Sequence, residues 1–192
     1  MKLNELKLTN PYLTLNEVCY DKVAATALKK TFLIHANKDV ARILNIDESE
    51  LETDTFVHLL NGEYRPEGSD PFAMCYAGHQ FGYFVPRLGD GRVINIGTIE
   101  KYHLQLKGAG VTEYSRSGDG RAVLRSSIRE YLMSEAMHGL KIPTTLCLGL
   151  IGSEHDVYRQ SIEKGAIVCR VSTSWVLLST MHLMVCLKNL KY

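Results

Sequence analysis

The sequence lacks the features that mark several common classes of protein. Its five cysteines are odd in number and no two have the Cys-x-x-Cys spacing, so neither a structural zinc site nor a disulfide framework is expected. Scattered buried thiols are typical of a reducing compartment, which predicts a cytoplasmic location. The first residues lack the apolar core of a signal peptide, and the apolar segment 176–187 is too short to span a bilayer. We therefore expect no membrane partner.

The chain also lacks an excess of charge of either sign. Its 22 Lys and Arg residues nearly balance 21 Asp and Glu residues, which gives a formal net charge of +1. Such a chain has no general attraction for nucleic acid, so no nucleic-acid partner is expected and any basic site must be local. Neither G-x-G-x-x-G nor G-x-x-x-x-G-K-[ST] occurs in its 192 residues, so neither a Rossmann site nor a P-loop is indicated.

The most informative feature that is present is a repeated tetrapeptide. Gly-Asp-Gly-Arg occurs at 89–92 and again at 118–121, and Lys107 lies between the two copies. Glycine lets backbone N–H groups approach an anion, and arginine offers a planar charged fork that matches phosphate. Each residue alone has a commoner explanation, because lysine and arginine are usually solvated, and Asp90 and Asp119 more often serve turns or caps than bind metal. The combination indicates a phosphate-handling surface with no metal ligands of its own.

Hydrophobic periodicity predicts an α+β domain in which one long helix packs on an antiparallel sheet. Strands are expected at 93–97 and 102–107, joined by a turn near Glu100, and the strongest helix is expected at 122–140 with Asp119 as a candidate cap. The main apolar stripe of this helix consists of Leu124, Ile128, Leu132, Ala136 and Leu140. The other expected elements are helices at 37–46, from Asp47 or Ser49 to Leu60, and at 71–83, a loop at 62–70, and strands at 144–151, 157–160 and 166–172.

Glu130 falls on a second, smaller apolar side of the long helix, beside Met133 and Met137. A carboxylate among apolar neighbours is costly unless it is paired, and Lys107 is the attractive partner. A strand lysine held by a helix glutamate is the device by which protein kinases direct a lysine onto ATP phosphates. Periodicity alone favours equally the alternative, an exposed Glu130 that pairs locally.

Four stretches together closely resemble the selenoprotein O family, over residues 10–175. They are Tyr-Ala-Gly-His-Gln-Phe-Gly at 76–82, Leu-Gly-Asp-Gly-Arg at 88–92, Gln-Leu-Lys-Gly-Ala-Gly at 105–110, and the long motif at 114–130. This family is a pseudokinase-like group that transfers AMP from ATP to Ser, Thr or Tyr hydroxyls of proteins. The resemblance implies a protein-kinase-like N-terminal lobe over 1–175, ATP with magnesium, and protein substrates of unknown identity.

The resemblance also implies roles for individual residues. Lys107 corresponds to the family's phosphate-binding lysine and Glu130 to its helix partner, which makes them the candidate catalytic pair. The residues implied to bind nucleotide are Gly89, Gly91, Arg92, Lys107, Asp119, Gly120 and Arg170. The resemblance further implies that ATP binds in a flipped orientation relative to kinases, with its α-phosphate open to attack.

The chain departs from the family pattern near its end. The family has a second arginine seven residues after Arg170, where this chain has Leu177, and segment 176–192 is expected to be a divergent, frameshifted tail. The family's catalytic aspartate and its magnesium ligands lie beyond the similar stretch. We therefore expect a truncated adenylyltransferase that is inactive alone. The alternatives are a non-catalytic nucleotide-binding or interaction fragment and a pseudogene product.

Overall fold

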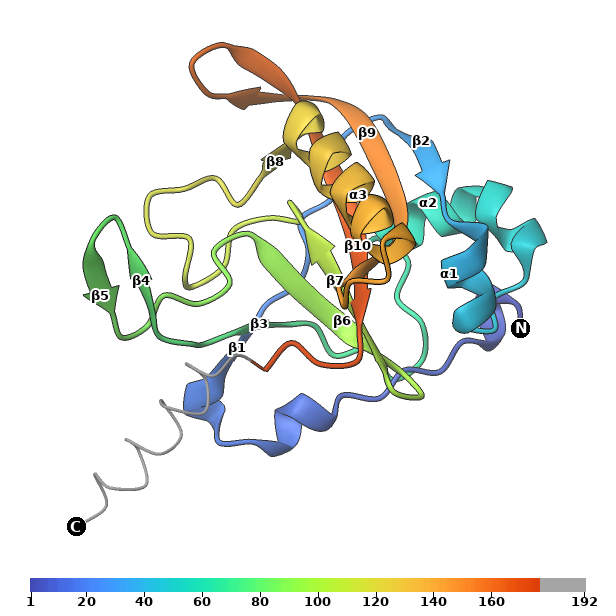
Figure 1. Cartoon of the computed structure of the whole chain (residues 1–192), viewed down its shortest axis with the longest axis horizontal. Helices are drawn as coiled ribbons and strands as arrows, with labels where there is room; N and C mark the ends of the chain where they lie inside the picture. Colours follow the sequence, from blue (N-terminus) through green and yellow to red (C-terminus); the bar gives the residue numbers. More distant parts are fainter. Residues whose placement is uncertain (177–192) are drawn as a thin grey trace.

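The computed structural model describes residues 1–176 and contains one eight-stranded antiparallel sheet (Figure 1). The strand order is β1-β3-β6-β7-β10-β9-β2, and the short β8 also pairs with β10. The strands are β1 (Tyr20–Lys22), β2 (Thr31–Ala36), β3 (Phe72–Met74), β6 (Val93–Ile99), β7 (Tyr102–Lys107), β8 (Ala122–Val123), β9 (Leu146–Tyr158) and β10 (Ile162–Ser172), with a separate hairpin of β4 (Gly78–Gln80) and β5 (Tyr83–Val85). The helices are α1 (Lys38–Ile43), α2 (Asp54–Leu60) and α3 (Leu124–Gly139), and 3-10 turns cover Leu3–Glu5, Pro11–Thr14, Glu17–Cys19 and Glu48–Glu52.

The two faces of the sheet carry different layers. On β7, Leu104 and Leu106 point into the main core, which also contains Phe56 of α2. Gln105 and Lys107 alternate with these leucines and therefore lie on the opposite face, against which α3 packs. Figure 1 shows α3 lying across β9 and β10 on that side. The predicted antiparallel sheet with one long packed helix is confirmed.

Helix α3 packs with a face that periodicity did not single out. Leu132 and Leu140 of the predicted main stripe are 61% and 70% exposed, whereas the buried residues of the helix are Ser127, Tyr131 and Ser134. The small serine side chains let the helix axis approach the sheet closely. The predicted cap is wrong too, because the N-cap position is held by the residue before Leu124 without any side-chain hydrogen bond.

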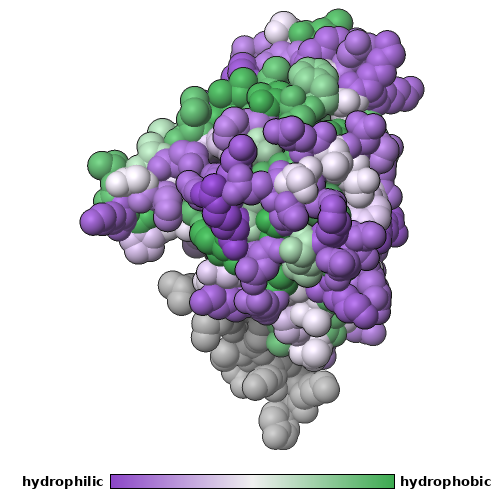
Figure 2. Space-filling view, turned by 90° about the vertical axis from the view of Figure 1, so that its right-hand side faces the viewer, coloured by the Kyte–Doolittle hydropathy of each residue, from purple (hydrophilic) through white to green (hydrophobic). Residues whose placement is uncertain are grey.

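The exposed stripe contributes to an apolar groove on the surface. Ile128 and Leu132 of α3 line it together with Ile34 of β2. Figure 2 shows an apolar area near the top of a face that is otherwise largely hydrophilic. The long helix therefore presents several apolar side chains to solvent, and it packs on the sheet through Tyr131 and Leu124 together with the small side chains of Ser127 and Ser134.

Several other predicted elements differ in the structure. Segment 71–83 is not a helix: it forms β3, which pairs with both β1 and β6, and the start of the β4–β5 hairpin, whose turn has positive φ at Phe81 and Gly82. The expected strands 144–151 and 157–160 fall largely within the single strand β9, which pairs with β10 on both sides of a register shift between Gly152 and Asp156. The expected second helix is divided by Thr53, which caps α2 after a separate 3-10 turn.

The strands on either side of Glu100 are confirmed, and so is the turn between them. Glu100 has φ +52°, and β6 and β7 pair in register around it. No helix within residues 1–176 is long and apolar enough to cross a membrane. The predicted divergence over 176–192, including Leu177, lies outside the described residues except for Val176.

Candidate functional site

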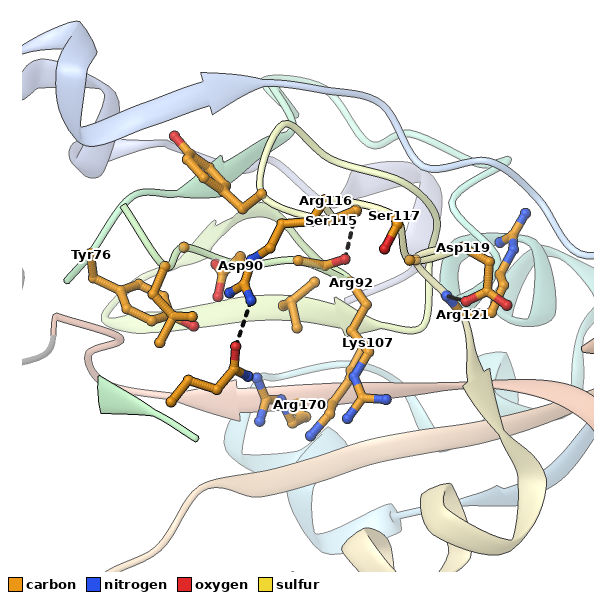
Figure 3. Close-up of a pocket in the computed structure, with 18 of the residues that line it drawn as sticks. Tyr76, Asp90, Arg92, Lys107, Ser115, Arg116, Ser117, Asp119, Arg121 and Arg170 are labelled. Carbon is orange, nitrogen blue, oxygen red and sulfur yellow. Dashed lines mark hydrogen bonds between the residues drawn. The ribbon is translucent and has the colours of Figure 1, made fainter. Parts of the chain in front are cut away.

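A cavity of about 570 Å³ lies between the two Gly-Asp-Gly-Arg turns and the α3 side of β7 and β10 (Figure 3). All seven residues predicted to bind nucleotide line it: Gly89, Gly91, Arg92, Lys107, Asp119, Gly120 and Arg170. Glu130 lies in an adjoining hollow that shares Arg92 and Lys107 with the main cavity. Residues from four separate elements thus converge on one site.

Glu130 of α3 holds two cations from the sheet. Lys107 Nζ lies 2.5 Å from Glu130 Oε2, and Arg170 Nη1 donates to Glu130 Oε1 at 3.1 Å. The Arg170 guanidinium also bonds Gln105 on the neighbouring strand and lies 4.7 Å from the ring centre of Trp175. These contacts confirm the predicted Lys107–Glu130 pairing and exclude an exposed glutamate that pairs locally.

This cluster has more positive than negative charge. Burial lowers the pKa of Lys107, and the positive charges of Arg170 and Arg92 lower it further, while Glu130 opposes both effects. A bound anion would add the missing negative charge and relieve the repulsion. Figure 3 shows Arg92, Lys107 and Arg170 close together in one part of the cavity.

The first glycine turn is built around Tyr114 and a buried aspartate. Gly89 has φ +57°, and a Cβ there would lie 2.1 Å from the Tyr114 ring, so only glycine fits. Asp90 Oδ2 accepts hydrogen bonds from Met74 N at 3.1 Å and from Asn95 Nδ2 at 3.4 Å. Burial raises the pKa of Asp90 to about 6. Asp90 is therefore an internal brace of the turn, as its turn-residue interpretation predicts.

The second glycine turn packs against the backbone of Gly110 on one side and faces the cavity on the other. Gly120 has φ +66°, and a Cβ there would lie 2.0 Å from the carbonyl oxygen of Gly110. The side chain of Asp119 is 42% exposed, and its Oδ1 accepts from Arg121 N at 2.9 Å. The side-chain hydrogen bond from Arg159 is the main cause that lowers the pKa of Asp119. Unlike Asp90, Asp119 remains at the cavity surface as a carboxylate.

The arginines of the two tetrapeptides have different environments. Arg92 is exposed, lines the cavity and forms no ion pair with any residue of the described 1–176. Arg121 is 8% exposed, and its Nη1 donates to the carbonyl oxygens of Thr26 at 2.6 Å and Gly108 at 3.4 Å. The first arginine is available to a ligand, whereas the second stabilises the loop.

Sequence reasoning missed three residues of the site. Gln105 is 2% exposed and bonds Arg170; strand alternation with Lys107 could have revealed it. Arg116 Nη1 donates to Gln80 Oε1 at 2.6 Å and so ties the second loop to the β4–β5 hairpin (Figure 3). Arg159 comes from the turn between β9 and β10, and no local pattern connects it with Asp119.

The site fits phosphate groups. The exposed guanidinium of Arg92, the Lys107 ammonium and Arg170 offer donors that match phosphate oxygens. Among residues 1–176 no group of three His, Cys, Asp or Glu side chains is placed to hold a metal.

Comparison with known proteins agrees with this geometry. The model of the family described as "Protein adenylyltransferase SelO" matches residues 2–192. A "Protein nucleotidyltransferase YdiU" from Bordetella avium is 48% identical over 179 residues, covering 91% of this chain and 36% of the relative. Proteins of the same name from Thiobacillus denitrificans and Flavobacterium johnsoniae are 46% and 44% identical, covering 91% and 96% of this chain.

The chain spans 36–38% of the length of these curated relatives. The range matched by the family model, residues 2–192, spans both glycine turns, the strand lysine and the helix glutamate. The chain belongs to the family of protein adenylyltransferase SelO.

Proposed function

We propose that this chain is the nucleotide-binding part of a protein adenylyltransferase, which transfers AMP from ATP to Ser, Thr or Tyr hydroxyls of proteins. The observation that carries the proposal is the cluster of Lys107, Glu130 and Arg170, facing the two glycine turns across one cavity. A strand lysine held by a helix glutamate on an antiparallel sheet is also the arrangement of the kinase N-terminal lobe, which supports a kinase-like lobe over 1–175.

Each residue has a distinct role in this proposal. Lys107, Arg170 and Arg92 contact phosphate oxygens, and Glu130 positions Lys107 and Arg170. Gly89, Gly91 and Gly120 shape the two turns that face the nucleotide, because a side chain at any of them would collide with the protein. The N–H groups of Gly89 and Gly91 hold the first turn itself, since they donate to Tyr76 O and Gly89 O. The hydroxyl oxygen bonds to the α-phosphorus, the bond between the α-phosphorus and its bridging oxygen breaks, and pyrophosphate leaves.

Magnesium would neutralise phosphate charge when bound. We propose that its ligands and the base for the attacking hydroxyl lie in the part of the longer relatives that this chain does not match. The 192-residue chain alone is accordingly proposed to bind ATP weakly and not to transfer AMP. A cytoplasmic location and unidentified protein substrates complete the proposal.

The test has two arms. The full-length Bordetella avium relative is incubated with ATP labelled at the α-phosphate or at the γ-phosphate, and label on protein is followed. We expect label from the α-position; label arriving only from the γ-position would make the family member a kinase and overturn the proposal.

In the second arm, ATP is titrated into the 192-residue chain. Trp175 is the one tryptophan of the sequence and lies over Arg170, so its fluorescence reports on the cavity. We expect weak, saturable binding. Absence of binding would remove nucleotide from the function of this chain, whereas tight magnesium-dependent binding would favour the alternative of an independent nucleotide-binding module.

A further inference from the structure

Arg159 joins two structural elements that are far apart in the sequence. It is the first residue of the turn between β9 and β10, where its N–H donates to Ser161 O at 3.0 Å. Its guanidinium reaches the second glycine turn: Nη1 donates to Asp119 Oδ2 at 2.7 Å and Nη2 donates to Asp119 Oδ1 at 2.9 Å. The result is a bidentate fork, the strongest geometry available to an arginine and a carboxylate.

The same guanidinium makes two further bonds that fix its orientation. Nη2 also donates to the carbonyl oxygen of Arg121 at 3.2 Å, and Nη1 to that of Tyr158 at 2.7 Å. The side chain therefore holds both ends of the Asp119–Arg121 segment against the β9–β10 turn. Only a third of the Arg159 side chain is exposed, and it lines the cavity with Asp119.

These contacts matter because the turn has few other restraints on its open side. Gly120 is fixed by the backbone of Gly110 beneath it, and Arg121 is anchored in the interior. Asp119 Oδ1 accepts the N–H of Arg121 at 2.9 Å, so the position of the carboxylate decides the shape of the turn. Arg159 is the side chain that sets that position from outside.

The charge of Asp119 is a second reason why its pairing with Arg159 matters for the site. A free Asp119 carboxylate would repel the phosphate groups that the neighbouring cations attract. The Arg159 fork neutralises the charge of Asp119 and holds both of its carboxylate oxygens in one orientation. Consistent with this, hydrogen bonding to Asp119 raises the pKa of Arg159.

We propose that Arg159 is a positioning residue for the nucleotide, which acts by holding and neutralising Asp119 at the second glycine turn; this inference rests on the proposed function. Arg159 itself need not touch the substrate. It completes a site whose other parts come from β7, β10, α3 and the two glycine turns.

The experiment compares Arg159→Gln and Arg159→Lys with a matched control, Arg42→Gln. Arg42 likewise bonds two carboxylate oxygens, at 2.5 and 2.7 Å, but lies on α1 away from the cavity. The first readout is hydrogen exchange of the Arg121 amide, which reports directly on the Asp119 carboxylate that accepts it. The second is the affinity for ATP, followed by Trp175 fluorescence.

We expect the Arg121 amide to exchange about tenfold faster in Arg159→Gln, and ATP to bind about tenfold more weakly, with Arg159→Lys intermediate and Arg42→Gln unchanged. If Arg159 acts through Asp119, adding Arg159→Gln to Asp119→Asn causes no further loss of ATP affinity. A residue that only stabilises the fold would not produce this coupling.

The inference is overturned if exchange of the Arg121 amide is unchanged in Arg159→Gln, or if ATP affinity falls equally with and without Asp119→Asn. If the wild-type chain binds no ATP, the proposed function fails and the positioning of nucleotide fails with it. Faster exchange at Arg121 would then still assign Arg159 as the anchor of the turn, so the two failures are distinguishable.

Discussion

Lys107 and Arg170, on adjacent strands of the sheet, share one carboxylate on the helix above them. Glu130 places Oε2 at 2.5 Å from Lys107 Nζ and accepts from Arg170 Nη1 through Oε1 at 3.1 Å. One negative charge thus holds two positive ones at the floor of a cavity. The side chains are prepared for an anion before it arrives, so little ordering cost remains when phosphate binds.

Because Lys107 and Arg170 share the Glu130 carboxylate, the effect of Lys107→Ala can be predicted. Because Arg170 still pairs with Glu130 after the substitution, the carboxylate is not left alone and the melting temperature should change little. ATP affinity should fall about tenfold, since one charge-assisted contact to phosphate is lost. Calorimetric melting and Trp175 fluorescence measure the two effects.

The control for this prediction is Lys164→Ala. Lys164 forms an ion pair of the same length, 2.5 Å, with Asp156 on the exposed part of the β9–β10 hairpin. The Lys164→Ala substitution should leave ATP affinity unchanged. Equal affinity in both variants would exclude Lys107 from the nucleotide site.

A second prediction concerns Gly89. Gly89→Ala should destabilise the protein because it combines a positive φ with a collision against the Tyr114 ring. The comparison is Gly82→Ala, since Gly82 also has a positive φ, +82°, but has nothing within 4 Å of a new Cβ. We expect Gly82→Ala to cost about 1 kcal/mol of unfolding free energy and Gly89→Ala about 2 kcal/mol more. Urea unfolding measures both; similar costs would mean that Tyr114 moves aside freely.

The sequence predicts well those parts of the site that depend on local pattern. Alternation along 102–107 places Lys107 on the face opposite the leucines, and helical periodicity places Glu130 on a smaller apolar side of the helix, where a pair with Lys107 and an exposed glutamate are equally favoured. The sheet with one packed helix follows from the same two periods. The two periods therefore offer the Lys107–Glu130 pair as one of two possibilities, the family resemblance favours it, and the structure confirms it.

What the sequence does not predict depends on contacts between distant segments. Periodicity predicts that the long helix packs on the sheet through its leucine stripe. In the structure the helix packs through the face with Ser127 and Ser134, whose small side chains allow close approach. The difference between Arg92 and Arg121 is likewise invisible in two identical tetrapeptides. Thr26, whose carbonyl oxygen accepts from Arg121, is 95 residues away in the chain.

A third prediction follows from the buried carboxyl of Asp90. Burial raises its pKa from 3.8 to about 6, so the folded protein binds the proton more tightly than the unfolded chain does. The stability that Asp90 contributes is therefore complete below about pH 4 and is lost as the pH rises through 6. The Asp90→Asn side chain cannot ionise, but it keeps an oxygen that can accept the hydrogen bond from Met74 N.

The measurement is the difference in unfolding free energy between Asp90→Asn and wild type across pH 4 to 7. Taking the difference cancels the opposite contributions of carboxylates such as Asp119, whose pKa is lowered. The variant should gain about 2 kcal/mol relative to wild type over this range as the pH rises. A flat difference would mean that Asp90 titrates normally and is not buried as described.

The last prediction separates the two arginines that follow Gly-Asp-Gly. Arg121→Ala should lower the unfolding free energy by about 2–3 kcal/mol, because it removes a buried guanidinium and leaves the carbonyl oxygens of Thr26 and Gly108 without a charged donor. Arg92→Ala should change it by less than about 0.5 kcal/mol, since Arg92 is exposed and lacks an ion pair within the described chain.

ATP affinity should show the reverse contrast. Arg92→Ala removes a cavity cation and should weaken ATP binding at unchanged stability, as followed by Trp175 fluorescence and urea unfolding. Arg121→Lys, which keeps a buried charged donor, should bind ATP nearly as the wild type does, because the guanidinium of Arg121 faces backbone carbonyls and not the ligand. If Arg92→Ala instead destabilised the fold and left affinity intact, the assignment of Arg92 to the nucleotide would be wrong.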